Sequence, residues 1–75
     1  MKVNSERVKE LREEKILSQR ELAKMAGISQ GTVWRMENGF VEVHPRTIRK
    51  LAKALGVDPR ELVNKEVRNS DEEAR

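Results

Sequence analysis

The sequence contains no cysteine and no tyrosine, and only one phenylalanine, one tryptophan and one histidine. Without cysteine no disulfide can stabilise a chain of 75 residues, so its stability must come from helix packing. A single histidine, no cysteine and no phosphate-cradling loop also leave little for metal binding or catalysis. We therefore expect no enzymatic activity, no cofactor and no metal site, and no small-molecule ligand is evident.

Long apolar segments are missing as well. No run approaches the roughly 20 apolar residues of a membrane-spanning helix, and the N-terminus lacks the apolar stretch of a signal peptide. These absences predict a soluble cytoplasmic protein without a membrane partner. The length supports one domain with a small core, and 39% charged against 36% hydrophobic residues suits a small helical protein.

The charge is modest in total but unevenly distributed. The formal net charge is +3, yet residues 66–75 hold four acidic and two basic groups, so residues 1–65 carry +5. Residues 44–53 contain four basic groups and no acidic one. Such a cluster fits a polyanion such as nucleic acid, although a basic helix face can also serve only to meet solvent.

Capping residues predict where the first two helices begin and end. A first helix should begin near residues 4–5, where Asn or Ser can cap it, and end near Lys15. Ser18 and Glu21 are spaced as a capping box at the start of a second helix. Gly27 fits the left-handed position that ends this helix.

The same signals predict three further helices and complete an all-α architecture. Their ranges are Ser29 to about Glu37, Pro45 to Gly56, and Asp58 to about Lys65. No alternating strand pattern occurs. We predict a compact five-helix bundle over residues 1–65 and a charged, flexible tail over residues 66–75.

The second and third helices are separated only by Gly27, Ile28 and Ser29. Each is about two turns long, and so short a glycine-containing turn forces the pair to cross steeply, as in a helix-turn-helix unit. Small helical proteins that bind no DNA also contain tight turns of this kind. The connection therefore favours a DNA-binding unit without establishing one.

The third helix has two chemically different sides. Val33 and Met36 are its only aliphatic positions and should face the core. Its other side carries Gln30, Gly31, Trp34, Arg35 and Asn38. Glutamine can pair with adenine and arginine with guanine in the major groove, so this side either reads bases or is an ordinary exposed face.

Residues 7–62 resemble the phage-repressor type of helix-turn-helix domain, the Cro/cI or XRE family. The matching residues are Arg12, LSQRELAKMAGIS (17–29), VWRMENG (33–39), and Pro45 with IRKLAKALGV (48–57). The resemblance implies a lambda-repressor-like domain of bacterial or phage type. Its third helix would enter the major groove, and the protein would usually bind a palindromic site as a dimer.

The resemblance, together with the facing of the third helix, predicts which residues touch DNA. Expected base contacts come from Gln30, Gly31, Trp34 and Arg35. Expected phosphate or minor-groove contacts come from Gln19, Ser29, Thr32, Asn38 and Arg46. The family also implies that Gln19 braces Gln30, and that Arg12 and Glu37 form an internal ion pair with a structural role.

Three departures from the family pattern matter. Ile16 stands where glycine or asparagine is common, so the turn there should be strained or differently shaped. The loop over residues 40–43 carries Glu42 and lacks the usual lysines and arginines. Gly31 and Trp34 replace small polar residues, so the target sequence cannot be copied from a relative.

Some positions allow two interpretations. Trp34 either contacts DNA or packs over the second helix. Phe40, Val41 and Val43 either join the core or form an exposed patch that predicts a twofold dimer. His44 fits a loop residue or a helix cap.

These features predict a sequence-specific double-stranded DNA-binding protein that regulates transcription, most simply a repressor. Two alternatives use the same fold: the antitoxin of a toxin–antitoxin pair, and a protein-interaction module that docks through the apolar loop. Retention on DNA that depends on salt would distinguish DNA binding from the interaction module.

Overall fold

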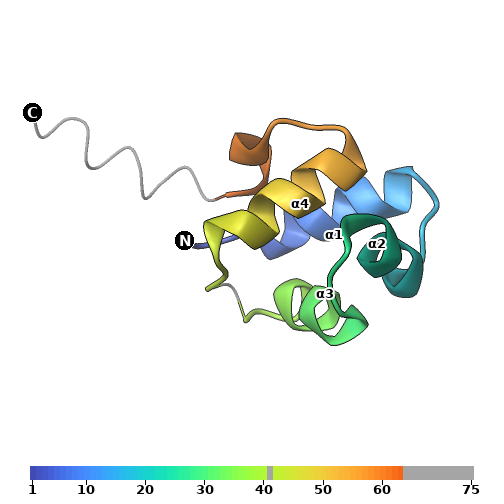
Figure 1. The fold of residues 1–75 in the computed structure, drawn as a ribbon, viewed down its shortest axis with the longest axis horizontal. Coiled ribbons are helices and arrows are strands. Elements are labelled where there is room, and N and C mark those ends of the chain that lie inside the picture. The colour runs from blue at the N-terminus through green and yellow to red at the C-terminus, as the bar shows by residue number, and fades with distance from the viewer. Residues whose placement is uncertain (41, 64–75) are drawn as a thin grey trace, which may run out of the picture.

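A computed structural model describes residues 1–40 and 42–63 of the chain (Figure 1). Val41, the predicted end of the last helix at Lys65 and the predicted tail over residues 66–75 lie outside the described residues. The elements are α1 (Ser5–Glu14), α2 (Gln19–Ala26), α3 (Gln30–Glu37), α4 (Pro45–Leu55) and the 3-10 turn η1 (Pro59–Leu62). None of the described helices is long and apolar enough to cross a membrane.

The first four predicted helices and their caps are confirmed. The Asn4 side chain accepts a hydrogen bond from the backbone of Arg7 at the start of α1. Ser18 and Glu21 form the complete capping box, with reciprocal bonds of 3.0 and 2.8 Å. The turn after α1 is strained as predicted, because Ile16 has a φ of +54°, a left-handed conformation that is unfavourable for a β-branched residue.

The predicted fifth α-helix is wrong, since η1 is a single turn of 3-10 helix. The Glu61 carboxylate accepts a bond from the Arg7 guanidinium at 3.1 Å instead of closing a capping box. Directly after the turn the backbone of Val63 is extended and forms a β-bridge with Val3. Pairing with the N-terminal segment therefore overrides the local helix signal.

One core holds these elements together. Helix α2 packs against α3 and α4, while α1 packs against α3 and η1. The buried apolar side chains come from every element and include Val8, Leu11, Leu22, Ala23, Ala26, Val33, Met36, Ile48, Leu51, Ala52, Leu55 and Leu62. The all-α class is thus confirmed, and residues 1–40 and 42–63 contain four α-helices in place of the five predicted.

The N-terminal segment joins two distant parts of the chain. The Asn4 amide donates to the Leu62 carbonyl at 2.7 Å, and the Val43 amide donates to the Met1 carbonyl at 3.0 Å. Val3 between them is fully buried. Residues 1–4 thereby fix the approach to α4 and the exit from η1.

Candidate nucleic-acid interface

The turn between α2 and α3 has a fixed geometry. Gly27 adopts the left-handed conformation (φ +73°), which only glycine takes without strain. The next amide, that of Ile28, donates to the Ala23 carbonyl at 3.0 Å, and the Ile28 side chain packs against the core. Ser29 then caps α3 by accepting a bond from the Thr32 amide at 3.1 Å. The two helices therefore form one rigid helix-turn-helix unit.

Helix α3 separates its two faces as the sequence indicates. Val33 and Met36 are buried, with exposed fractions of 0% and 1%. Trp34 is 49% exposed, so half of its surface is open to a partner. The remaining exposed residues on this helix and its C-cap are Gln30, Gly31, Arg35 and Asn38. We call the set Gln30, Gly31, Trp34 and Arg35 the reading face.

A buried ion pair anchors the C-terminal end of α3 to α1. Both oxygens of the Glu37 carboxylate accept bonds from the Arg12 guanidinium, at 2.7 and 3.0 Å, and this pair is the one that the family resemblance implies. The Glu37 side chain is only 3% exposed. Its hydrogen bonds raise the pKa of Arg12, and Arg12 also donates to the Leu17 carbonyl at 2.8 Å. The pair therefore positions α3 relative to α1.

The predicted brace between Gln19 and Gln30 is wrong. The Gln19 amide group donates to Glu37 at 3.0 Å instead. A carboxylate buried to this extent needs several donors, and Gln19 supplies the third after the two from Arg12. Gln19 is thus an internal partner of the ion pair, half-buried at the first turn of α2.

Three predicted phosphate-contact residues stabilise the ends of α3. The Ser29 and Thr32 hydroxyls are hydrogen-bonded to each other at 2.7 Å at its N-terminus. The Asn38 side chain donates to the Trp34 carbonyl at 2.8 Å at its C-terminus. All three residues therefore fix the ends of the helix that carries the reading face.

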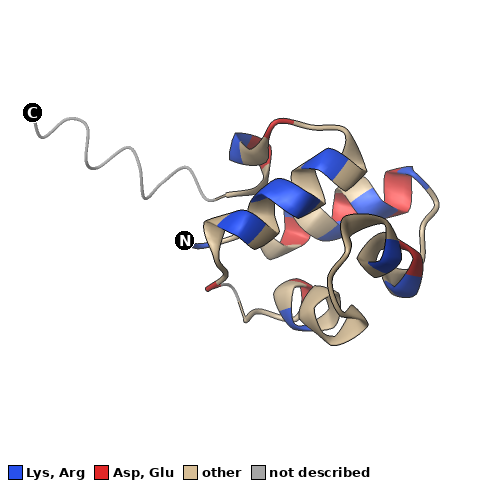
Figure 2. Cartoon of the chain, in the orientation of Figure 1, with Lys and Arg blue, Asp and Glu red and all other residues tan. Residues whose placement is uncertain are grey.

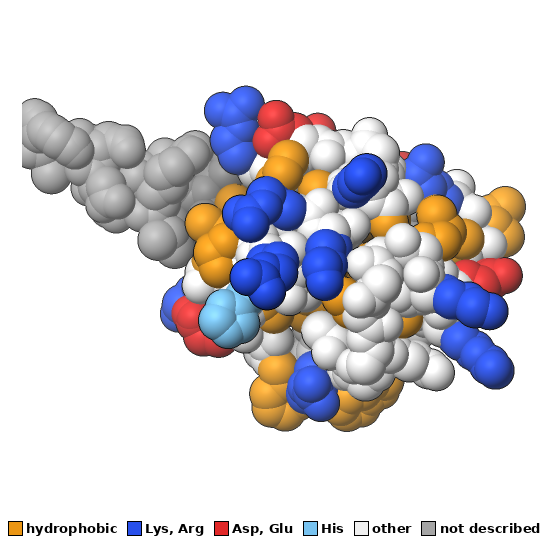
Figure 3. Space-filling model, in the orientation of Figure 1, with side chains coloured by type: hydrophobic (Ala, Val, Ile, Leu, Met, Phe, Trp, Pro, Cys, Tyr) orange, Lys and Arg blue, Asp and Glu red, His pale blue; other side chains and the backbone are white. Residues whose placement is uncertain are grey.

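Helix α4 presents the cationic face of the molecule. Its exposed charged residues are Arg46, Arg49, Lys50 and Lys53, and the helix contains no acidic residue (Figure 2). The space-filling view shows lysine and arginine side chains gathered over this helix, beside the single histidine (Figure 3). His44 occupies the N-cap position of α4 without a side-chain capping bond.

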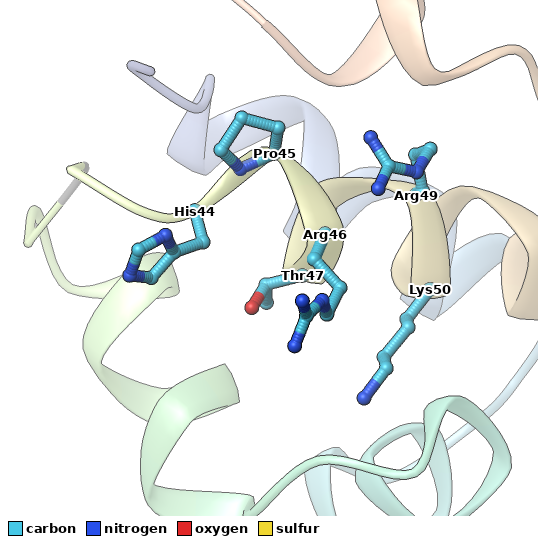
Figure 4. A pocket seen from close by; sticks show the side chains of 6 residues that line it. All are labelled: His44, Pro45, Arg46, Thr47, Arg49 and Lys50. Atoms are coloured by element: carbon cyan, nitrogen blue, oxygen red, sulfur yellow. The ribbon is translucent and has the colours of Figure 1, made fainter.

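A cleft of about 510 Å³ opens at the N-terminal end of α4. Its lining residues are His44, Pro45, Arg46, Thr47, Arg49 and Lys50. Arg46 and Lys50 point together toward the part of the fold that holds α2 and α3, whereas Arg49 points away from it (Figure 4). Lys50 is not among the DNA contacts that the sequence predicts. The one-turn spacing of residues 46 and 50 on an acid-free helix was the available signal.

The apolar residues of the loop before α4 differ in burial, since one lies on the surface and another packs against the core. Phe40 is 60% exposed, while Val43 is half-buried and packs against the core. Val41 lies outside the described residues. An exposed aromatic residue therefore lies next to the end of α3.

Comparison with known proteins identifies the family. The helix-turn-helix family HTH_3 matches residues 8–62. The chain is 37% identical over 68 residues to the cryptic phage CTXphi transcriptional repressor RstR of Vibrio cholerae. That alignment covers 91% of this chain, and the chain spans 61% of the length of that curated relative.

Solved structures share the fold. The restriction-modification controller protein C.AhdI from Aeromonas hydrophila is 42% identical, with a TM-score of 0.73 over 76% of this chain and 86% of that one. The P22 c2 repressor, solved in complex with a synthetic operator, is 28% identical, with a TM-score of 0.75 over 80% of this chain and 91% of that one. A hydroxyethylphosphonate dioxygenase is 20% identical over 14% of its own length, which shows the fold alone.

The family match covers most of the described chain and includes the helix-turn-helix unit, the internal ion pair and α4. The more similar relatives are a transcriptional repressor and a controller protein. The chain therefore belongs to the HTH_3 helix-turn-helix family.

Proposed function

We propose that this protein binds double-stranded DNA in a sequence-specific manner and represses transcription by occupying its site. The observation that carries the proposal is the placement of an acid-free reading face on a rigidly held helix. That helix belongs to the same compact unit as the cationic face of α4. This combination suits a ligand that is both a polyanion and a source of sequence information.

The two faces have different roles in this proposal. Gln30 reads adenine, Arg35 reads guanine, Trp34 contacts a thymine methyl group or the groove wall, and Gly31 allows close approach. Phosphate or minor-groove contacts come from Gln19, Ser29, Thr32, Asn38 and Arg46, and the cleft at α4 adds Lys50. The domain that performs this role spans residues 1–65, and the protein acts in the cytoplasm without enzymatic activity.

Exposed Phe40 supports a twofold dimer in this proposal. A large aromatic side chain with 60% of its surface exposed is a suitable centre for a self-complementary interface. Two copies related by a twofold axis would bind a palindrome whose half-sites lie about one helical turn apart.

Selection of binding sites from a random pool of double-stranded DNA tests the function. We expect an enriched palindromic sequence and an affinity that falls steeply as salt rises. Absence of both enrichment and salt-dependent retention would overturn the proposal. Exposed Phe40 also favours a second candidate, a protein-interaction module, and binding of a protein partner in the absence of DNA binding would establish that one.

A further inference from the structure

Gly31 differs from the other three glycines of the chain. Gly27, Gly39 and Gly56 all have positive φ values, between +72° and +97°, and lie at turns or helix ends. Gly31 lies inside α3 with an ordinary helical backbone, where glycine weakens a helix relative to alanine. Its backbone conformation therefore does not require glycine.

The guanidinium of Arg35 lies over Gly31. A Cβ atom added to Gly31 would be 3.7 Å from Nη1 of Arg35 and 3.9 Å from Oγ of Ser29. Both distances are ordinary van der Waals contacts, so a methyl group fits. A longer side chain that continues from this Cβ toward Nη1 would enter the space that the guanidinium occupies.

Helix geometry explains this arrangement. Side chains on an α-helix lean toward its N-terminus, and residues four apart are neighbours on its surface. Residue 35 therefore covers the surface over residue 31, provided that residue 31 leaves it room. Within residues 1–40 and 42–63 the Arg35 guanidinium has no hydrogen bond or ion pair that would hold it elsewhere.

We propose that Gly31 is a specificity-determining residue, because its missing side chain lets the Arg35 guanidinium read the base step that faces the first turn of α3. This inference rests on the proposed function. Gly31 itself is a positioning residue, and the base contact belongs to Arg35. The reading face thereby concentrates its guanine contact near the helix N-terminus, beside Gln30.

Four variants test the inference: Gly31→Ala, Gly31→Leu, Arg35→Ala and the double variant Gly31→Leu/Arg35→Ala. Circular dichroism first establishes that each is folded. We expect the wild type and Gly31→Ala to select the same guanine. Gly31→Leu and Arg35→Ala should both lose that preference, by about 5- to 150-fold in discrimination at one base pair. Leucine offers no hydrogen bond, so it cannot replace the arginine as a reader.

The double variant separates positioning from simple obstruction. If leucine acts through Arg35, adding it to Arg35→Ala should change affinity by less than twofold. If it obstructs DNA by itself, it will weaken Arg35→Ala as much as it weakens the wild type, and the inference is then wrong. Retained guanine preference in Gly31→Leu would overturn it equally.

A measurement on the unbound protein tests the position of the Arg35 side chain without requiring DNA binding. Nuclear Overhauser contacts between the Gly31 α-protons and the Arg35 side chain are expected in the wild type. The same contacts, between the α-proton of residue 31 and the Arg35 side chain, should persist in Gly31→Ala and disappear in Gly31→Leu. Their absence from the wild type would overturn the inference. A wild type that selects no DNA sequence would contradict the proposed function and leave this contact measurement as the test of the geometry.

Discussion

Helices α3 and α4 both bury one apolar face and expose the other, yet the exposed faces differ in chemistry. The reading face of α3 holds one cation among neutral residues, whereas α4 presents four cations and no acid. Neutral donors and acceptors distinguish base pairs, while cations attract any phosphate. Under the proposed function, base reading therefore lies on α3, whereas most of the cationic attraction to phosphate lies on α4.

Arg12→Ala should remove the ion pair that holds α3 against α1. It leaves the buried Glu37 carboxylate without its cation and the Leu17 carbonyl without a donor, so we expect a loss of about 3 kcal/mol in the free energy of unfolding. Urea titration measures this change. Arg7→Ala is the matched control on the same helix, because Arg7 pairs only with half-exposed or exposed carboxylates and should cost much less. Equal losses in the two variants would contradict the role of the ion pair.

Arg35→Ala should reduce selectivity more than general affinity. We expect binding to the selected site to weaken by about 1–3 kcal/mol, with little change on unrelated DNA, because one guanine contact is lost. Competition binding with the selected and a scrambled site measures both. A uniform loss on the two DNAs would place Arg35 among the phosphate contacts instead.

Arg46→Ala should show the opposite behaviour. It should weaken binding to all sequences alike and reduce the slope of log affinity against log salt by about one unit. Arg49→Ala is the matched control, since Arg49 lies on the same helix but points away from α2 and α3 (Figure 4). The assignment fails if Arg49→Ala changes the salt slope as much as Arg46→Ala.

Asp58→Asn should alter stability alone and leave both faces intact. Hydrogen bonds from Arg60 lower the pKa of Asp58, so the folded state favours the ionised carboxylate. This contribution is present at neutral pH and is lost as pH falls through the lowered pKa. The variant should therefore show a small loss of stability at pH 7 and a flatter decline in acid. Thermal unfolding between pH 2 and 7 measures it, and an unchanged acid decline would count against the Asp58–Arg60 pair.

Local signals predicted the elements whose ends are set by nearby residues. Ser18 with Glu21, and Gly27 after them, fix α2 through contacts within one turn, which sequence spacing reveals directly. The prediction of a fifth α-helix was wrong because Val63 pairs with Val3, which lies 60 residues earlier in the chain. Spacing within residues 58–65 contains no information about that partner.

The candidate site shows the same limit. The two sides of α3 follow from helical periodicity, so the reading face could be predicted. The partner of Gln19 could not, because the demand of the buried Glu37 carboxylate depends on tertiary packing. The position of the Arg35 guanidinium over Gly31 depends on a rotamer, and the joint direction of Arg46 and Lys50 depends on how α4 is turned in the fold.

The backbone hydrogen bonds made by residues 1–4 also constrain the order in which the chain can fold during synthesis. Val3 leaves the ribosome before its bridge partner Val63 and before the Leu62 carbonyl that binds Asn4, which are made almost a whole domain later. The fully buried Val3 must therefore stay unpaired while the helices between are translated. We therefore expect the core to close late, and ribosome-bound chains that end before residue 62 should remain sensitive to protease at their N-terminus.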